Sequence, residues 1–366
     1  MSEKISRRSA KLDIIRIFAL FCVNGIHFFT FSGFLGYDIN NVSMYALTVM
    51  RTFFTICVPM FIVLTGYLSC KKTLSKKYYR GIVKVLAIYI LACIAIYPYR
   101  VFYLQENISV LSLGTGILNF TAAPYAWYVE MYIGLFMLIP FLNLIYNNLH
   151  SRTHKLALIG TMVFLTALPG TLNVWCLHSP AFWAMPSSID SYTQLIPQWW
   201  VGIYPMTYYF IGCYLREYGI KISKKTNFVL IAAAVILFGG MNIYRSYPVH
   251  FVGGAWQDWG CLSNVVIATL VFNLLLKIDD SKISAKLNKP LAVVSDLTFG
   301  GYLMSFISDN FLYTRIDAAA QSGDMLIKYF PLAPIASFIF CLAASLVLNI
   351  IYNLICKAAA AVSAKK

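Results

Sequence analysis

Two basic side chains with a defined spacing lie in the first apolar stretch of the chain. Arg16 and His27 are eleven residues apart in the segment KLDIIRIFALFCVNGIH. At about 100° per residue, that spacing puts both on one face of a helix, about 16 Å apart along its axis. Charged groups in a membrane-spanning helix cost several kcal/mol unless they face a bundle interior or a wet cavity. The spacing therefore favours a shared channel.

Each of these side chains also has a structural interpretation. Arg16 can extend to the inner headgroups, and His27 can be a helix-packing donor. In a channel, by contrast, an imidazole that titrates near neutral pH suits a general base or a transient nucleophilic carrier. The other four histidines are expected in solvated loops: His150, His154, His178 and His250. With no Cys-x-x-Cys and most cysteines in apolar runs, we expect no metal site.

The composition indicates the solvent in which these residues lie. Of the 366 residues, 60% are hydrophobic and 12% are charged, about half the roughly 25% charged residues of soluble domains. The net charge of +15 does not indicate nucleic acid, because Lys and Arg cluster between apolar runs and form no continuous basic stripe. We expect residues 1–366 to form one all-α membrane domain, with the lipid bilayer as its surroundings and no nucleic-acid partner.

Apolar runs recur along the whole chain, and a helix needs roughly 20 residues to cross the hydrocarbon core. They predict a polytopic bundle of about ten transmembrane helices. The predicted spans are 12–31, 45–69, 81–104, 126–147, 156–169, 199–216, 226–244, 258–276, 291–313 and 331–356. The fifth is short. The first follows a basic start but lacks a small-residue cleavage pattern, so it is read as a retained helix.

Orientation follows from the basic residues, since cytoplasmic loops carry the excess of Lys and Arg. The start (Lys4, Arg7, Arg8, Lys11), alternate loops and the tail (Lys357, Lys365, Lys366) are basic. This predicts both termini in the cytoplasm, together with residues 71–80, 216–225 and 277–290. Residues 170–198 and 314–330 are expected outside. The outside loop 170–198 is long enough to suggest a lid or a binding surface.

Several further motifs occur in a fixed order. They are VPMFIVLTGYL (58–68), a basic patch from Lys77 through Arg80 to Lys84, AWYVEMY (126–132), YFIGCYL (209–215) and TFGGYL (298–303). Together with the Arg16-to-His27 spacing, the series resembles acyltransferase family 3, over residues 11 to 313. One position departs from the family pattern. A histidine often follows the TFGGYL-like segment in the family, whereas here the chain reads MSFISD, with Ser305 in its place.

The resemblance implies a multi-pass enzyme of the cytoplasmic membrane. It would move an acyl group, acetyl most simply, from cytoplasmic acyl-CoA to a sugar hydroxyl of a cell-surface polysaccharide, cell-wall glycan or glycolipid precursor. His27 and Arg16 would be catalytic. Acyl-CoA is a polyanion, and the residues placed to bind it are Lys77, Arg80 and Lys84. Ordinary positive-inside topology explains those three equally well. Asp13 is grouped with them, because it either orients or neutralises Arg16.

Four residues are assigned to the sugar acceptor. Glu130 and Asp309 are expected in the outer halves of their spans, where a carboxylate either holds sugar hydroxyls or tunes His27. Trp127 and Tyr128 can stack on a sugar ring, or they belong to an aromatic belt at the outer interface. The competing function is a transporter or flippase of a glycan or lipid intermediate. It is disfavoured, since the chain shows no hydropathy repeat and no matched pair of Gly/Pro-broken helices.

Overall fold

The computed structural model describes residues 8–188, 192–254 and 256–363. These residues form helices and connecting loops, and their β-type pairing is a single isolated bridge between Asp38 and His250. The basic residues Lys4, Arg7, Lys365 and Lys366, on which the predicted orientation drew, lie outside the described residues. The predicted all-α membrane architecture is confirmed for the part of the chain that the structure describes.

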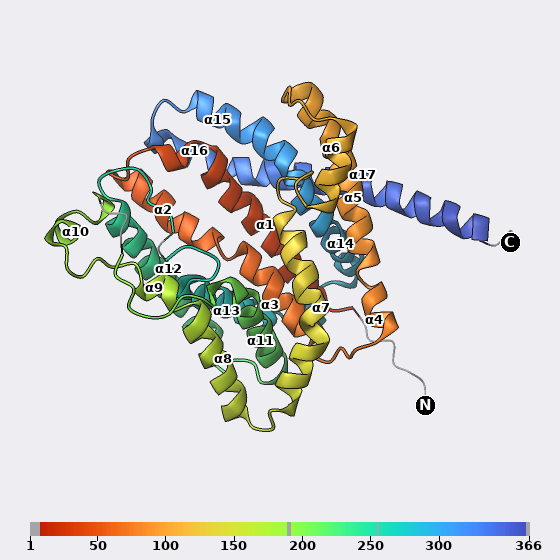
Figure 1. Ribbon diagram of the computed structural model, residues 1–366, viewed down its shortest axis with the longest axis horizontal. Coiled ribbons are helices and arrows are strands. Elements are labelled where there is room, and N and C mark those ends of the chain that lie inside the picture. Colours follow the sequence, from red (N-terminus) through yellow and green to blue (C-terminus); the bar gives the residue numbers. More distant parts are fainter. Residues whose placement is uncertain (1–7, 189–191, 255, 364–366) are drawn as a thin grey trace.

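Figure 1 shows the arrangement of the helices. In chain order they are α1 (Ala10–Phe31), α2 (Val42–Phe54), α3 (Cys57–Ser69), α4 (Lys76–Arg80), α5 (Val83–Pro98), α6 (Val110–Leu118), α7 (Trp127–Asn148), α8 (Arg152–Thr166), α9 (Pro169–Leu172), α10 (Pro180–Ala184), α11 (Tyr204–Glu217), α12 (Lys224–Ser246), α13 (Leu262–Leu276), α14 (Ala285–Ser308), α15 (Thr314–Ala319), α16 (Leu326–Tyr329) and α17 (Leu332–Ser363). Helix α17 projects beyond the bundle at its C-terminal end (Figure 1).

A helix lies at each of the ten predicted spans. Among the described residues, seven helical segments are long and apolar enough to cross a membrane: α1, α2 with α3, α4 with α5, α7, α12, α14 with α15, and α17. The other three, α8, α11 and α13, have only 14 or 15 residues. A helix of that length rises about 21 Å, less than the roughly 30 Å of hydrocarbon. Helix α11 tolerates this, because nearly all of it from Pro205 to Leu215 is buried in protein.

The pairing of α1 with α14 shows that short helices must count as crossings. Arg16 contacts Ser295 and His27 contacts Asp309, so both helices run in the same direction across the bundle. An odd number of crossings must then separate them. The long segments between them are α2 with α3, α4 with α5, α7, and α12, an even number. Adding α8, α11 and α13 restores an odd number and gives ten crossings in the part of the chain that the structure describes.

Contacts between loops match the predicted alternation of sides. On one side, the bridge from Asp38 to His250 joins the loop after α1 to the loop after α12. The Tyr37 hydroxyl donates to the Ala320 carbonyl on the same side. On the other, Ser9 donates to Asp280. Each contact joins loops that the charge pattern places on one side of the membrane.

The α3–α11 contact depends on two glycines. A Cβ on Gly66 would lie 2.1 Å from the Tyr209 carbonyl oxygen, and a Cβ on Gly212 would lie 2.2 Å from the Val63 carbonyl oxygen. Small residues let membrane helices approach closely, which maximises van der Waals packing. Both glycines belong to the motifs noted in the sequence. Those motifs therefore hold α3 in place, and α3 supplies a wall of the site described next.

Candidate active site

His27 is held by a buried carboxylate from α14's end. Asp309 begins a π turn, Asp309–Tyr313, that continues α14 toward α15, and such turns are frequent at functional sites. Its Oδ2 lies 2.6 Å from His27 Nδ1 and accepts a hydrogen bond of 2.7 Å from the Tyr125 hydroxyl. Asp309 is fully buried. Because an ionised carboxylate only accepts, this geometry assigns the proton of the neutral imidazole to Nδ1 and leaves Nε2 with a free lone pair.

Ser305 occupies the position at which the family often has a second histidine. Its Oγ lies 3.4 Å from His27 Nδ1 and donates to the Tyr302 carbonyl at 2.7 Å. Ser305 is also fully buried. The closer polar partner of His27 is therefore Asp309, one helical turn further along, and no second imidazole is needed to orient the ring.

The ring of His27 lines a cavity of about 640 Å³, called here the outer cavity. Its other lining groups come from α1, α2, α3, α7, α11, α14 and the loops before α7, α11 and α13. They include Arg51, Trp127, Tyr204, Asp258 and Trp259. Trp127 and Trp259 stack on each other, with ring centroids 4.3 Å apart and planes at 15°. The cavity thus combines an imidazole with aromatic surface and side chains of opposite charge.

Two side chains of opposite charge, Arg51 and Asp258, line the outer cavity. The Arg51 guanidinium donates to the Gln257 side-chain oxygen and lies over the Phe251 ring, 4.4 Å from its centroid, while its Nε is buried without a hydrogen-bond partner. Asp258 belongs to the loop between α12 and α13 and is open to the cavity. Burial by the surrounding protein raises the pKa of its carboxyl, and the nearby Arg51 partly offsets this.

Arg16 lines a second, smaller cavity of about 230 Å³, called here the inner cavity. Its walls are mostly apolar, with Ser69 and Thr298 among the polar groups. The Arg16 guanidinium donates to Ser295 Oγ at 2.8 Å and lies 3.8 Å from Asp13. Its side chain is 29% exposed, so it has hydrogen-bonding capacity left for a ligand.

A family model described as an acyltransferase domain matches residues 9–354, nearly the whole chain. The chain belongs to acyltransferase family 3. No curated protein and no solved structure matches it. Family membership confirms the resemblance drawn from the ordered motifs, and with the helical architecture it makes this protein a membrane acyltransferase.

Asp13 of the acyltransferase has partners within the protein. Arg8 holds its carboxylate through both oxygens at 2.8 to 3.1 Å, and the same guanidinium reaches Asp296. Asp13 is 3% exposed and lines neither cavity. Asp13 therefore lies beside Arg16 and is held by Arg8, which is compatible with either expected role, orienting or neutralising Arg16.

The other predicted residues fall into two groups. Tyr128 lines the inner cavity and Trp127 the outer cavity, where Trp259 already covers one face of its ring. Glu130, Lys77, Arg80 and Lys84 are exposed and line neither cavity. Lys84 lies 6.0 Å from the Tyr352 ring centroid, next to Val85, which does line the inner cavity. Of the two carboxylates, Asp309 contacts His27, whereas Glu130 is exposed and lines neither cavity.

The loop 170–198, which the sequence suggested as a lid or a binding surface, does not line the outer cavity in its described part. None of its described residues, 170–188 and 192–198, lines the outer cavity, whose nearest contributors in that part of the chain are Val201 and Gly202. The segment contains α9 and α10, and Arg245 of α12 donates to the Pro186 carbonyl and to the Tyr192 hydroxyl. Asp190, a polar residue of this loop, lies outside the described residues.

Sequence reasoning missed three residues of the acyltransferase site. Arg51 carries a charge inside the predicted span 45–69, the same signal that singled out Arg16, and Asp258 stands at the edge of the span 258–276. Both were detectable by that rule. Tyr125 gave no signal, because its role depends on the hydrogen bond it makes to a carboxylate 184 residues away.

Proposed function

We propose that this acyltransferase moves a short acyl group, acetyl in the simplest case, from cytoplasmic acyl-CoA to a hydroxyl of a sugar acceptor at the outer side of the cytoplasmic membrane. The observation that carries the proposal is that the inner and outer cavities meet between Arg16 and His27. Both cavities are lined by Val23, Val58 and Tyr302. A donor entering at Arg16 and an acceptor bound beside His27 would face each other across that junction.

The donor arm suits the inner cavity. Its apolar walls accept a thin, uncharged chain, while Arg16 at its polar end can pair with a carbonyl or phosphate of the donor. The exposed basic residues of α4 and of the start of α5, Lys77, Arg80 and Lys84, supply positive charge on the side expected to be cytoplasmic. From Arg16 to His27 along α1 a donor arm must cover about 16 Å.

The chemistry follows from the orientation of His27. Its Nε2 accepts the proton of the acceptor hydroxyl as that oxygen attacks the thioester carbonyl carbon. A carbon–oxygen bond forms, the carbon–sulfur bond breaks, and the imidazolium returns the proton to the departing thiolate. Asp309 accepts from Nδ1–H throughout and stabilises the charged ring, as the carboxylate does in hydrolase triads. Direct transfer is preferred to an acyl-imidazole carrier, because an acceptor beside His27 would face the donor across the junction of the two cavities and no shuttle is required.

The acceptor side fits a polyhydroxyl ligand. The Trp127 and Trp259 pair offers apolar ring surface, and Asp258 and Arg51 offer an acceptor and a donor for hydroxyl groups. A pocket of mainly apolar surface with a few placed polar groups is the usual form of a small-molecule site. Polysaccharide, cell-wall glycan and glycolipid precursor all present such hydroxyls.

The test uses purified protein in lipid vesicles, given acetyl-CoA labelled in its acetyl group and a set of sugar acceptors. We expect acceptor-dependent release of free CoA thiol and equal incorporation of label into ester. If the acceptor instead crossed the vesicle membrane with acetyl-CoA untouched, the transporter interpretation would replace this one. Membranes from cells lacking the protein give the background.

A further inference from the structure

The two cavities are separated by a narrow wall with three contributors. Val23 of α1, Val58 of α3 and Tyr302 of α14 each line both cavities. Yet they are only 1%, 3% and 5% exposed, so little open space remains between them. Along α1, Val23 stands about 10 Å beyond Arg16 and about 6 Å before His27. Any acyl group that reaches His27 from the inner cavity must pass this junction.

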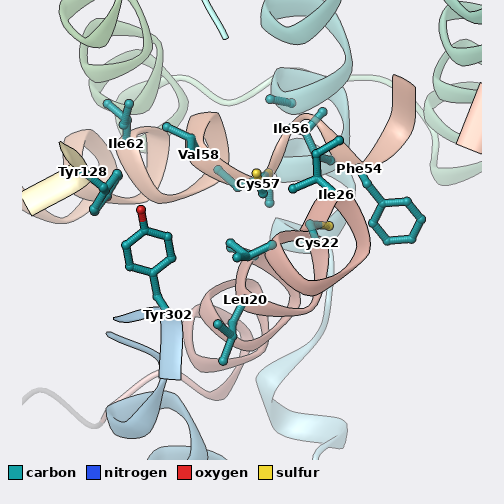
Figure 2. Close-up of a cluster of buried hydrophobic side chains, with 14 of the residues drawn as sticks. Leu20, Cys22, Ile26, Phe54, Ile56, Cys57, Val58, Ile62, Tyr128 and Tyr302 are labelled. Atoms are coloured by element: carbon teal, nitrogen blue, oxygen red, sulfur yellow. The ribbon is translucent and has the colours of Figure 1, made fainter. Parts of the chain in front are cut away.

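The junction is fixed by its neighbours. The Tyr302 hydroxyl donates to the Tyr125 carbonyl at 2.8 Å, and its ring packs edge-on against Tyr128, with centroids 5.4 Å apart. Tyr125 is the same residue that donates to Asp309, so the wall and the His27 partner share one anchor. Figure 2 shows Tyr302 with its hydroxyl end beside Tyr128 and toward α3, the helix that carries Val58.

We propose that Val23, Val58 and Tyr302 select the transferred acyl group by its cross-section and charge, admitting short, unbranched, uncharged groups such as acetyl. The inference rests on the proposed function and deepens it, since it concerns the acyl group and not the acceptor.

Two physical arguments support this selection. Two of the three contributors are β-branched valines, whose side chains have few rotamers and cannot move aside freely. A branched acyl group such as isobutyryl would overlap them. The junction also lacks a free donor for a carboxylate, because the Tyr302 hydroxyl is already engaged. A succinyl group would therefore leave its charge unpaired in apolar surroundings, which is strongly unfavourable.

The experiment compares kcat/KM for acetyl-CoA, isobutyryl-CoA and succinyl-CoA at one saturating acceptor concentration. Wild type should use acetyl-CoA well and the other two poorly. One methyl group in a close-fitting pocket changes selectivity by about tenfold or more. Val58→Ala and Val23→Ala should each raise the isobutyryl-to-acetyl ratio by about that factor. Val229→Ala is the matched control, because Val229 of α12 is 55% exposed and lines neither cavity.

The outcomes separate the two claims. Equal use of acetyl-CoA and succinyl-CoA by wild type, or an isobutyryl-to-acetyl ratio unchanged within twofold in both valine variants, would overturn the selection proposal and leave acyl transfer standing. Failure of wild type to use any acyl-CoA would remove the proposed function itself. A ratio that rises equally in Val229→Ala would show that the change is not specific to the junction. Because each variant is judged by a ratio, partial loss of folded protein does not affect the result.

Discussion

The carboxylate of Asp309 fixes the imidazole of His27 although 282 residues separate them in the chain. The Oδ2 to Nδ1 distance is 2.6 Å, and the Tyr125 hydroxyl donates to the same oxygen at 2.7 Å. The second carboxylate oxygen, Oδ1, is buried with no hydrogen-bond partner. These contacts therefore direct the carboxylate at Nδ1 of His27 and leave Nε2 to face the outer cavity.

His27→Ala should abolish acyl transfer while the protein stays folded. Loss of a general base typically costs about 10²- to 10⁴-fold in rate, whereas interhelical polar contacts in membranes average about 0.6 kcal/mol, so a packing role would change turnover little. The measurement is transfer from labelled acyl-CoA by purified protein, at matched yield and monodispersity. A variant that kept more than about a tenth of wild-type activity would make His27 structural.

Asp309→Asn should lower kcat far more than it raises KM for the acceptor. An amide can donate its own proton to Nδ1, which moves the imidazole proton to Nε2 and blocks the base, a change that costs about 10⁴-fold in a hydrolase triad. Tyr125→Phe, which removes one hydrogen bond to the carboxylate, should be milder, at about 1.5 to 3 kcal/mol or less. If Asp309→Asn acted on acceptor KM alone, the carboxylate would be a ligand-binding group.

Asp258 should make acceptor binding depend on pH. Its folded pKa is raised above 3.8 by burial, so acceptor KM should rise as pH falls through that raised value and the carboxylate is protonated. Asp258→Asn should show a flat KM over the same range, about tenfold weaker than wild type at neutral pH. The measurement is acceptor KM for wild type and Asp258→Asn across pH 4 to 7. Parallel pH profiles for both proteins would exclude a role for the Asp258 carboxylate in acceptor binding.

The same shift gives Asp258→Asn a second readout. A carboxyl whose pKa is higher in the folded than in the unfolded chain is ionised at a cost to the fold, and that cost is present at pH above both values. The variant should therefore be as stable as wild type or more stable at neutral pH, while it binds acceptor less well. Thermal unfolding in detergent at pH 7 measures this, and a clear loss of stability would show that Asp258 supports the fold.

Arg16→Ala should raise KM for acyl-CoA more than KM for the acceptor. A charge-assisted hydrogen bond is worth about 1.5 to 3 kcal/mol, or roughly 10- to 150-fold in affinity. Arg80→Ala should act in the same direction but less, because Arg80 is exposed and lines no described cavity. Lys225→Ala, an exposed basic residue on another loop predicted to be cytoplasmic, is the control. Equal effects of all three substitutions would show that Arg16 and Arg80 contribute only general positive charge.

The predicted orientation of the helices determines which introduced cysteines a membrane-impermeant thiol reagent can reach in intact cells. With Cys176 and Cys356 replaced by Ser, Ser188→Cys should react from outside and Lys224→Cys should not. Both positions are exposed in the fold, so a difference in labelling reports the side of the membrane. The reverse pattern would place Arg16 at the outer face and exclude entry of cytoplasmic acyl-CoA there.

Features that depend on local properties of the chain could be predicted before the fold was known. Apolar runs predicted the helices, and alternating basic loops predicted their orientation. The cost of an unpaired polar or charged side chain inside a membrane span singled out Arg16, His27 and Asp309. The same argument applied to Arg51 and Asp258 would have found them. Glu130 shows its limit, because a carboxylate near the end of a span can avoid the cost by facing outward.

Which of these residues lie together depends on packing between helices that are distant in the sequence. Helical periodicity put Arg16 and His27 on one face, but it gave no register for α14, whose stripe of Ser295, Tyr302 and Asp309 meets that face. That register is set by the packing of α14 against α1, which brings Ser295 to Arg16 and Asp309 to His27. The division into two cavities has the same origin. Whether Val23, Val58 and Tyr302 meet is fixed by three helices distant in sequence, and no local pattern encodes their separation.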